Sequence, residues 1–163
     1  MLDIYIDGDA CPVKDEVLKV AERHKLMVYV VSNSWMRLPT HPLLELVVVP
    51  EGPDVADDWI AERVGSGDIA ITADIPLANR CLEKKADVLG HTGKPFTENS
   101  IGMALAMRDL KAHLRETGEI NGYNASFSKE DRSRFLQALE QTIQLIKRRK
   151  KLGLSRNTLV NKS

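Results

Sequence analysis

Cysteine, aromatic residues and long apolar runs are all scarce in this sequence of 163 residues. Its two cysteines, Cys11 and Cys81, lie far apart, which excludes a disulfide framework and a CxxC redox or zinc motif. No run approaches the ~18 consecutive apolar residues that a membrane-spanning helix needs. The first residues include Asp3 and Asp7, where a secretory signal would carry positive charge. We therefore expect a cytosolic protein with reduced thiols and no membrane association.

Net charge is also absent, because 23 basic residues balance 23 acidic ones, but the charges are unevenly distributed. Residues 147–163 contain seven Lys or Arg and no acid, which leaves 16 basic against 23 acidic residues, or −7, in residues 1–146. An acidic body attracts metal cations, and a basic tail attracts an anionic partner. A solvated, frayed terminus is the simpler interpretation of the tail. We expect one domain over residues 1–146 and a flexible basic tail over residues 147–163.

Five short segments have the composition of β-strands, and helical patterns alternate with them. The expected strands cover residues 2–6, 27–31, 46–49, 69–72 and 86–89, and the polar segment 33–42 is a long loop. Helices are expected from Pro12, after Asp54, from Pro76, over residues 99–115 and from Ser128, which opens a Ser-Lys-Glu-Asp capping motif.

The last of these helices has apolar residues at three- and four-residue spacing: Leu136, Leu139, Ile143 and Ile146. This stripe is most simply a face packed on the domain, and a homodimer formed through the last helix is the alternative.

The alternation predicts a three-layer α/β/α domain around a mainly parallel five-stranded sheet, followed by a C-terminal helix and the basic tail. In such sheets, ligands bind beyond the carboxyl ends of the strands. Asp7 ends the first strand, Asp74 follows the fourth, and Asp57 and Asp58 lie near the start of the helix after the third. These acids are therefore expected to converge at one edge of the sheet.

Carboxylates brought together in this way repel one another unless a cation neutralises them, and hard oxygen ligands select Mg²⁺ or Mn²⁺. A bound ion of this kind can polarise a phosphate and activate water. The alternative is that Asp7 and Asp9 belong to a turn, and that Asp57 and Asp58 are first-turn charges of a helix. Asp54 is the acid most readily assigned to helix capping.

Several other features give weaker signals. Cys11 and Cys81 are interpreted as packed small residues. The segment Gly90–Pro95 lacks the spacing of a phosphate-binding loop, although Lys94 could reach a phosphate from its rim. The four histidines show no ligand spacing, so none is assigned a catalytic role. Trp35 and Arg37, in the long loop, are candidates either for contact with a nucleotide or for a hydrophobic plug at the sheet edge.

Three segments in order, Asp7–Lys14, Asp54–Ile60 and Ile71–Ala78, resemble the signature blocks of the YaiI/YqxD family of bacterial proteins. The resemblance continues through Gly93, Phe96-Thr97, Asn99–Ile101 and Arg108, and reaches Asp131-Arg132 and Phe135. It covers nearly the whole chain except the basic tail.

That family in turn resembles the PIN-like nucleases, which implies a PIN-like fold with a Mg²⁺ or Mn²⁺ site. The resemblance implies that Asp7, Asp57 and Asp74 hold the metal, with Asp58 as a further ligand and Asp9 assisting or orienting water. Lys14, Asn99 and Arg108 are the implied substrate-binding residues. One position departs from the pattern, because many PIN nucleases carry another acid where this sequence has Pro76.

Three functions remain open at this stage. The first is a metal-dependent nuclease, acting on RNA, with Asp7, Asp9, Asp57 and Asp74 as its catalytic acids. The second is a non-catalytic PIN-like module that binds nucleic acid or a protein, with salt-sensitive contacts from the tail. The third is a phosphatase of the haloacid-dehalogenase type, in which Asp7 attacks and Asp9 is the acid or base. Cys11 speaks against the third, because it stands where Thr or Val is expected.

Overall fold

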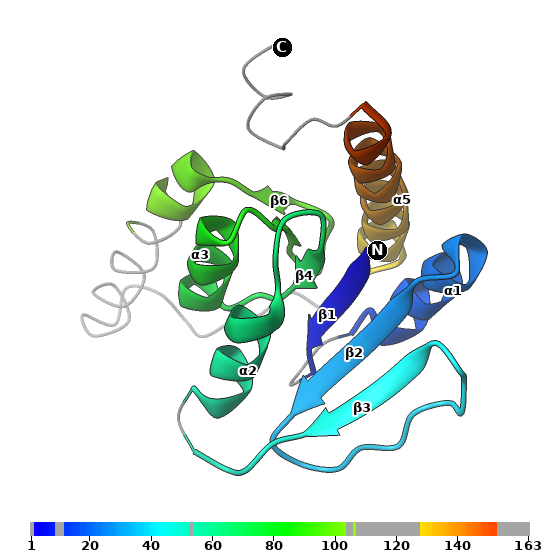
Figure 1. Ribbon diagram of the computed structural model, residues 1–163, viewed down its shortest axis with the longest axis vertical. Helices are drawn as coiled ribbons and strands as arrows, with labels where there is room; N and C mark the ends of the chain where they lie inside the picture. The colour runs from blue at the N-terminus through cyan, green and yellow to red at the C-terminus, as the bar shows by residue number, and fades with distance from the viewer. Residues whose placement is uncertain (1, 9–11, 53, 104–105, 107–127, 153–163) are drawn as a thin grey trace.

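The computed structural model describes residues 2–8, 12–52, 54–103, 106 and 128–152, and Figure 1 shows their arrangement. The strands are β1 (Asp3–Asp7), β2 (Met27–Ser32), β3 (Leu44–Val48), β4 (Ile69–Ile71), β5 (Asp87–Leu89) and β6 (Pro95–Phe96). The helices with complete bounds are α1 (Lys14–His24), α2 (Val55–Arg63), α3 (Ile75–Glu83) and α5 (Lys129–Leu152). Residues 98–103 are also helical, and the rest of the expected helix 99–115, apart from helical residue 106, lies outside the described residues.

The strands form one sheet in the order β3-β2-β1-β4-β5-β6. Every neighbouring pair is parallel except β5 with β6, so the prediction of a mainly parallel sheet is confirmed. The strand order places β1 and β4 next to each other in the middle, although more than sixty residues separate them in the chain. Their carboxyl ends consequently meet at the same edge of the sheet.

Helices cover both faces of the sheet, as Figure 1 shows, and side chains alternate between the two faces along each strand. In β1, Ile4 and Ile6 pack with α1 and α5, whereas Tyr5 between them packs with α2 and α3. Apolar residues line both faces because neither face of the central strands meets water. The three-layer α/β/α arrangement predicted from the sequence is therefore observed.

The last helix, α5, packs its predicted stripe on the domain: Leu139, Ile143 and Ile146 are buried, and Leu136 is partly buried against the same core. Phe135, which was not part of the predicted stripe, is fully buried beside them. The predicted cap is confirmed, because the Ser128 hydroxyl accepts from the Asp131 backbone N–H at 3.1 Å and the Asp131 carboxylate accepts from the Ser128 N–H at 3.0 Å. The helix continues to Leu152, so the first residues of the tail are helical. A homodimer through this helix stays a prediction.

Two expectations about local structure are wrong. The segment after β5 is not only a loop, because Pro95 and Phe96 form a short sixth strand that pairs antiparallel with β5. Proline is tolerated there because β6 lies at the edge of the sheet. Helix α1 begins at Lys14 rather than at Pro12, which lies in the preceding turn. No described helix is long and apolar enough to cross a bilayer.

A buried ion pair joins the end of α5 to the sheet. The Arg149 guanidinium donates to the carboxylate of Asp87, the first residue of β5, and the two side chains are only 6% and 19% exposed. The Arg149 Nε has no hydrogen-bond partner among the described residues. The charge of Arg149 therefore depends on Asp87 for compensation.

Replacing Asp87 with Asn should destabilise the protein by about 3 kcal/mol, because it leaves a buried charge without its counter-ion. The melting temperature should fall by roughly 6–12 °C in a thermal unfolding experiment followed by circular dichroism. The Glu62→Gln variant is the control, because Glu62 and Arg63 form an exposed pair that should contribute little. Equal melting temperatures for the two variants would show that the buried pair is not stabilising.

Candidate active site at the carboxyl edge of the sheet

The site begins at Asp7, the last residue of β1, and at Thr72, which directly follows β4. Ile6 pairs with Ile71, so the two next residues lie side by side at the end of their strands. Gly8 directly follows Asp7, and its N–H donates to the Val31 carbonyl at 2.8 Å. A Cβ at this position would lie only 2.8 Å from that oxygen, so only glycine allows the close approach.

Thr72 connects two of the predicted acids. Its hydroxyl donates to Asp7 Oδ2 at 3.0 Å and accepts from the Asp74 backbone N–H at 2.9 Å. Thr72 is fully buried, whereas Asp7 is half-buried and Asp74 is exposed. Thr72 therefore fixes the orientation of the Asp7 carboxylate relative to the backbone at Asp74.

Asp74 is also the N-cap of α3. Its Oδ1 accepts from the Leu77 N–H at 2.9 Å, and Pro76 lies at the start of the helix as the sequence predicts. The expectation that the Asp54 side chain caps α2 is wrong. Asp54 occupies the N-cap position of α2, but its backbone is left-handed, with φ of 65°, and its side chain makes no capping hydrogen bond.

Asp57, in the first turn of α2, completes the acidic group on electrostatic grounds. Burial, followed by the negative charges of Asp74, Asp7 and Asp54 and opposed by Arg80, raises the pKa of its carboxyl to about 6. Such an effect requires these carboxylates to be near one another. The structure thus brings Asp7, Asp57 and Asp74 from three elements into one region of negative potential, here called the acidic edge.

The other residues predicted to belong to the site differ in their positions and partners. The Asp58 Oδ1 accepts from Arg80 at 2.7 Å, so its charge is already compensated by a cation. Lys14 lies beside the acidic edge, with its Nζ 3.4 Å from the Gly8 carbonyl oxygen. Asn99 is exposed on the helical segment 98–103. Asp9, Cys11 and Arg108 lie outside the described residues.

The donor atoms of the acidic edge suit a hard divalent cation, because all of them are carboxylate oxygens. Among the described residues, however, no group of three or more His, Cys, Asp or Glu side chains is arranged to surround an ion. The fit to a metal is therefore one of charge and ligand chemistry.

Two residues at this edge were not predicted from the sequence. One is Thr72, which could have been found from the sequence because it places a hydroxyl at the end of an apolar strand. The other is His91, which follows β5 as Asp74 follows β4, and whose Nε2 is buried without a partner among the described residues. Burial and the charge of Lys14 lower the pKa of His91, so its ring is neutral at pH 7. The rule that ligands bind beyond the carboxyl ends of parallel strands, which pointed to the aspartates, also points to His91 when it is applied to β5.

Trp35 lies in the loop after β2 and is 73% exposed. The interpretation of this residue as a hydrophobic plug is therefore wrong, whereas its neighbours Met36 and Leu38 do pack against the core. Cys81 is buried in the core as predicted, and burial raises the pKa of its thiol to about 12.

Comparison with known proteins agrees with the family resemblance that the sequence segments indicated. The model of the family described as "Uncharacterized BCR, YaiI/YqxD family" matches residues 5–145. The chain belongs to the YaiI/YqxD family.

A UPF0178 protein of Parvibaculum lavamentivorans is 68% identical over 149 residues, which cover 91% of this chain and 98% of that protein. A UPF0178 protein of Rhodospirillum rubrum is 60% identical over 148 residues, covering 90% and 99%. One of Gluconobacter oxydans is 55% identical over 153 residues, covering 94% and 86%. No solved structure matches the chain.

The YaiI/YqxD match includes the whole acidic edge and ends at residue 145, before the basic run 147–151 at the end of α5. The match therefore covers most of the sheet and its helices, without the last turns of α5. The names of these relatives state no activity, so the chemistry has to be argued from the site itself.

The raised pKa of Asp57 gives a stability prediction with a definite sign. The folded state holds the proton more tightly than the unfolded chain, so ionisation of Asp57 destabilises the fold above pH 6 and has no effect below pH 3.8. Asp57→Asn should therefore raise the melting temperature at pH 7.5 by ~3 °C, which corresponds to roughly 1 kcal/mol after allowance for solvent screening. At pH 3.5 the two proteins should melt alike. A variant less stable than the parent at pH 7.5 would contradict the assignment.

Proposed function

We propose that this protein is a metal-dependent phosphodiesterase that hydrolyses nucleic acid at the acidic edge. The observation that supports this most is the proximity of Asp7, Asp57 and Asp74, whose mutual repulsion, added to burial, raises the pKa of Asp57 to about 6. Proteins retain such a destabilising arrangement where a ligand uses it, and a divalent cation is the ligand that relieves it directly.

The residues of the acidic edge have separate tasks under this proposal. Asp7 and Asp74 would hold the cation from fixed positions, because Thr72 orients the first and the start of α3 restrains the second. Asp57 would gain most from a bound cation, since its pKa is raised to about 6 without one. When bound, Mg²⁺ or Mn²⁺ supplies Lewis acidity toward a phosphate and a more acidic water.

The surroundings of the acidic edge favour a nucleic acid over a small phosphate ester. Lys14 provides a cation beside the carboxylates, and Trp35 provides an exposed aromatic surface on the loop that follows β2. Bases stack on such surfaces, and phosphates pair with such cations. RNA is the substrate that the family resemblance implies, and a cytosolic location suits it. Asp9, Asn99 and Arg108 keep the roles proposed from the sequence.

A non-catalytic binding module is the second candidate, and two observations favour it. The described residues do not include a preformed set of three metal ligands, and Pro76 stands where many PIN nucleases have an acid. A phosphatase of the haloacid-dehalogenase type depends on Asp9, which lies outside the described residues, and no observation favours it.

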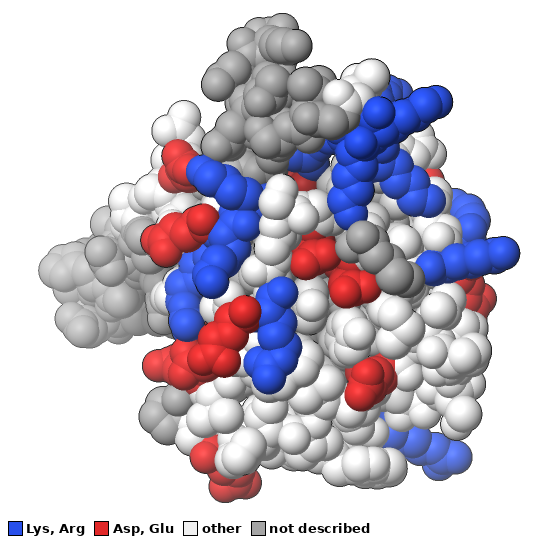
Figure 2. Space-filling view, viewed as in Figure 1, with Lys and Arg blue, Asp and Glu red and all other residues white. Residues whose placement is uncertain are grey.

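The position of the basic tail also bears on the second candidate. Arg149 pairs with the first residue of β5, and Lys150 lies against Gly67, just before β4. The basic end of α5 is therefore at the amino edge of the sheet, opposite the acidic edge, and Figure 2 shows Lys and Arg side chains gathered over this half of α5. A nucleic acid bound there would contact a different edge of the domain from the carboxylates.

Asp74→Asn tests the proposed hydrolysis without removing the helix cap, because asparagine caps helices as well as aspartate does. The parent should bind Mn²⁺ saturably in calorimetric titration and should cleave single-stranded RNA or DNA only when Mn²⁺ or Mg²⁺ is present. The variant should lose at least 100-fold of the cleavage rate, an order-of-magnitude expectation for removing a ligand of a catalytic ion. Its melting temperature should stay within a few degrees of the parent's.

Glu62→Gln is the matched control, because it removes one negative charge from the exposed side of α2 and should leave metal binding and cleavage unchanged. Metal-independent binding of nucleic acid by the parent, with no cleavage under any metal condition, would favour the binding module. If neither metal binding nor nucleic-acid binding is observed, the nuclease and the nucleic-acid-binding module are both wrong.

A further inference from the structure

A pocket next to the acidic edge has no part in the chemistry proposed above. It has a volume of about 600 Å³ and lies between the start of α3 and the turn that follows β5. Ala73 and Ile75, which flank Asp74, form one wall, and His91 and Phe96 belong to the other. We call it the Phe96 pocket. A ligand in it would lie next to the chain segment that carries Asp74, because Ala73 and Ile75 line it.

The turn that forms the second wall is held in place by two backbone hydrogen bonds. The Gly90 N–H donates to the Lys94 carbonyl at 2.9 Å, and the Gly93 N–H donates to the Gly90 carbonyl at 3.1 Å. Gly93 has φ of 86°, and a Cβ there would lie 2.7 Å from the Arg134 carbonyl oxygen of α5. Only glycine satisfies both conditions, so the turn is fixed against α5. The wall of the Phe96 pocket is consequently preformed, which lowers the cost of binding.

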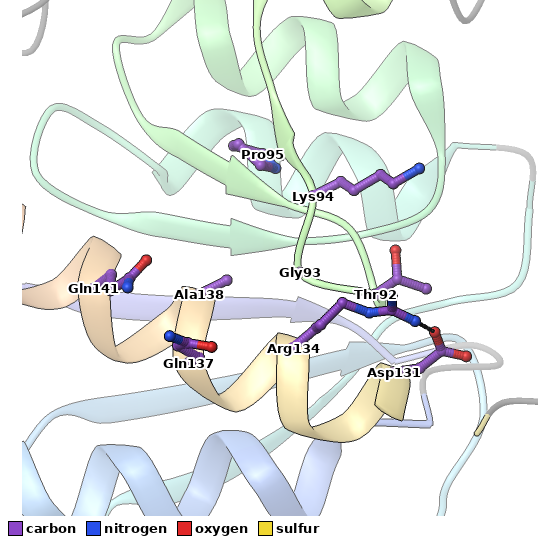
Figure 3. A pocket seen from close by; sticks show the side chains of 9 residues that line it. All are labelled: Thr92, Gly93, Lys94, Pro95, Asp131, Arg134, Gln137, Ala138 and Gln141. Atoms are coloured by element: carbon purple, nitrogen blue, oxygen red, sulfur yellow. Dashed lines mark hydrogen bonds and ion pairs between the residues drawn. The ribbon is translucent and has the colours of Figure 1, made fainter. Parts of the chain in front are cut away.

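The same turn presents an exposed cation. Lys94 borders the Phe96 pocket, and its side chain forms no ion pair with any described residue. It also borders a second pocket of about 410 Å³ between the turn and α5, shown in Figure 3. In that second pocket the guanidinium of Arg134 is already paired, since it donates to Asp131 at 2.7 Å. Lys94 extends away from Gln137 and Gln141 of α5 in the same view. Its charge therefore remains available to a ligand outside the second pocket.

The apolar lining of the Phe96 pocket and the cation of Lys94 at its opening together indicate the kind of ligand. Ile75, Ala73 and Phe96 offer apolar and aromatic surface, which suits an aromatic ring and not a phosphate. The cation at the rim suits a phosphate adjoining that ring. A nucleoside unit has both parts, and the pocket volume is in the range of pockets that take ligands of this size. A base inside a duplex is stacked and paired, so only an unpaired base can enter.

We propose that the Phe96 pocket receives one unpaired base of a single-stranded nucleic acid, stacked on Phe96, with an adjoining phosphate at Lys94. The proposal rests on the proposed function in making the bound strand the substrate of the acidic edge. It adds that the substrate is single-stranded and that one base is held on the α3 side of Asp74.

The test is equilibrium binding without metal, measured by fluorescence anisotropy with a labelled single-stranded oligonucleotide of about six nucleotides in EDTA, as RNA and as DNA. Phe96→Leu keeps an apolar side chain but removes the π-face, and it should raise Kd about tenfold. Lys94→Gln should raise Kd several-fold and should reduce the salt dependence of binding by about one phosphate contact.

Lys84→Gln is the matched control, because Lys84 is an exposed lysine that precedes β5, whereas Lys94 follows it. This variant should bind like the parent. A second measurement needs no variant of the protein: an abasic oligonucleotide of the same length should bind the parent about tenfold more weakly than the complete one. A duplex of the same sequence should also bind more weakly. Equal affinity for the abasic strand or for the duplex, or an unchanged Kd for folded Phe96→Leu, would overturn the proposal.

The two proposals fail separately. If the parent binds single strands through Phe96 but never cleaves them, the proposed hydrolysis is wrong and the base pocket stands. If the parent cleaves with metal but Phe96→Leu leaves both Kd and KM unchanged, the hydrolysis stands and the base pocket is wrong.

Discussion

The parallel pairing of β1 with β4 is the constraint on which the rest of the structure depends. It brings Asp7 and Thr72 to the same level at the carboxyl edge, and the Thr72 hydroxyl then connects the Asp7 carboxylate to the backbone of Asp74. The same pairing sets the positions of α2 and α3, which supply Asp57 and the helix start that Asp74 caps. Moving β4 by one residue would turn Thr72 to the other face and separate these groups.

The two edges of the sheet have opposite electrostatic character. At the carboxyl edge, burial and then the negative charges of Asp74, Asp7 and Asp54 raise the pKa of Asp57. At the amino edge the basic end of α5 compensates acids, through Arg149 on Asp87 and through the charge of Lys150 near Asp68. The amino edge therefore stabilises the fold, while the carboxyl edge carries a charge imbalance that a bound cation would relieve. This difference makes the carboxyl edge the candidate site.

Much of the architecture could be predicted because it follows from local composition. Apolar runs such as 27–31 indicate strands covered on both faces, Pro76 indicates a helix start, and Ser128 with Asp131 indicates a cap. The convergence of Asp7, Asp57 and Asp74 followed from one topological rule. The errors arose where short-range patterns have several outcomes: Pro12 precedes its helix, Asp54 does not use its side chain as a cap, and Pro95 and Phe96 form an edge strand.

The sequence by itself determined the family, the three-layer class and the strands whose ends carry the acids, because periodicity and turn residues are properties of neighbouring positions. Only the tertiary structure decided that Thr72 joins Asp7 to Asp74, that Arg80 compensates Asp58, and that His91 and the Phe96 pocket lie beside the acids. These relations join residues that are distant in the chain, and their hydrogen bonds, burial and charge interactions exist only after the sheet has fixed the distances between them.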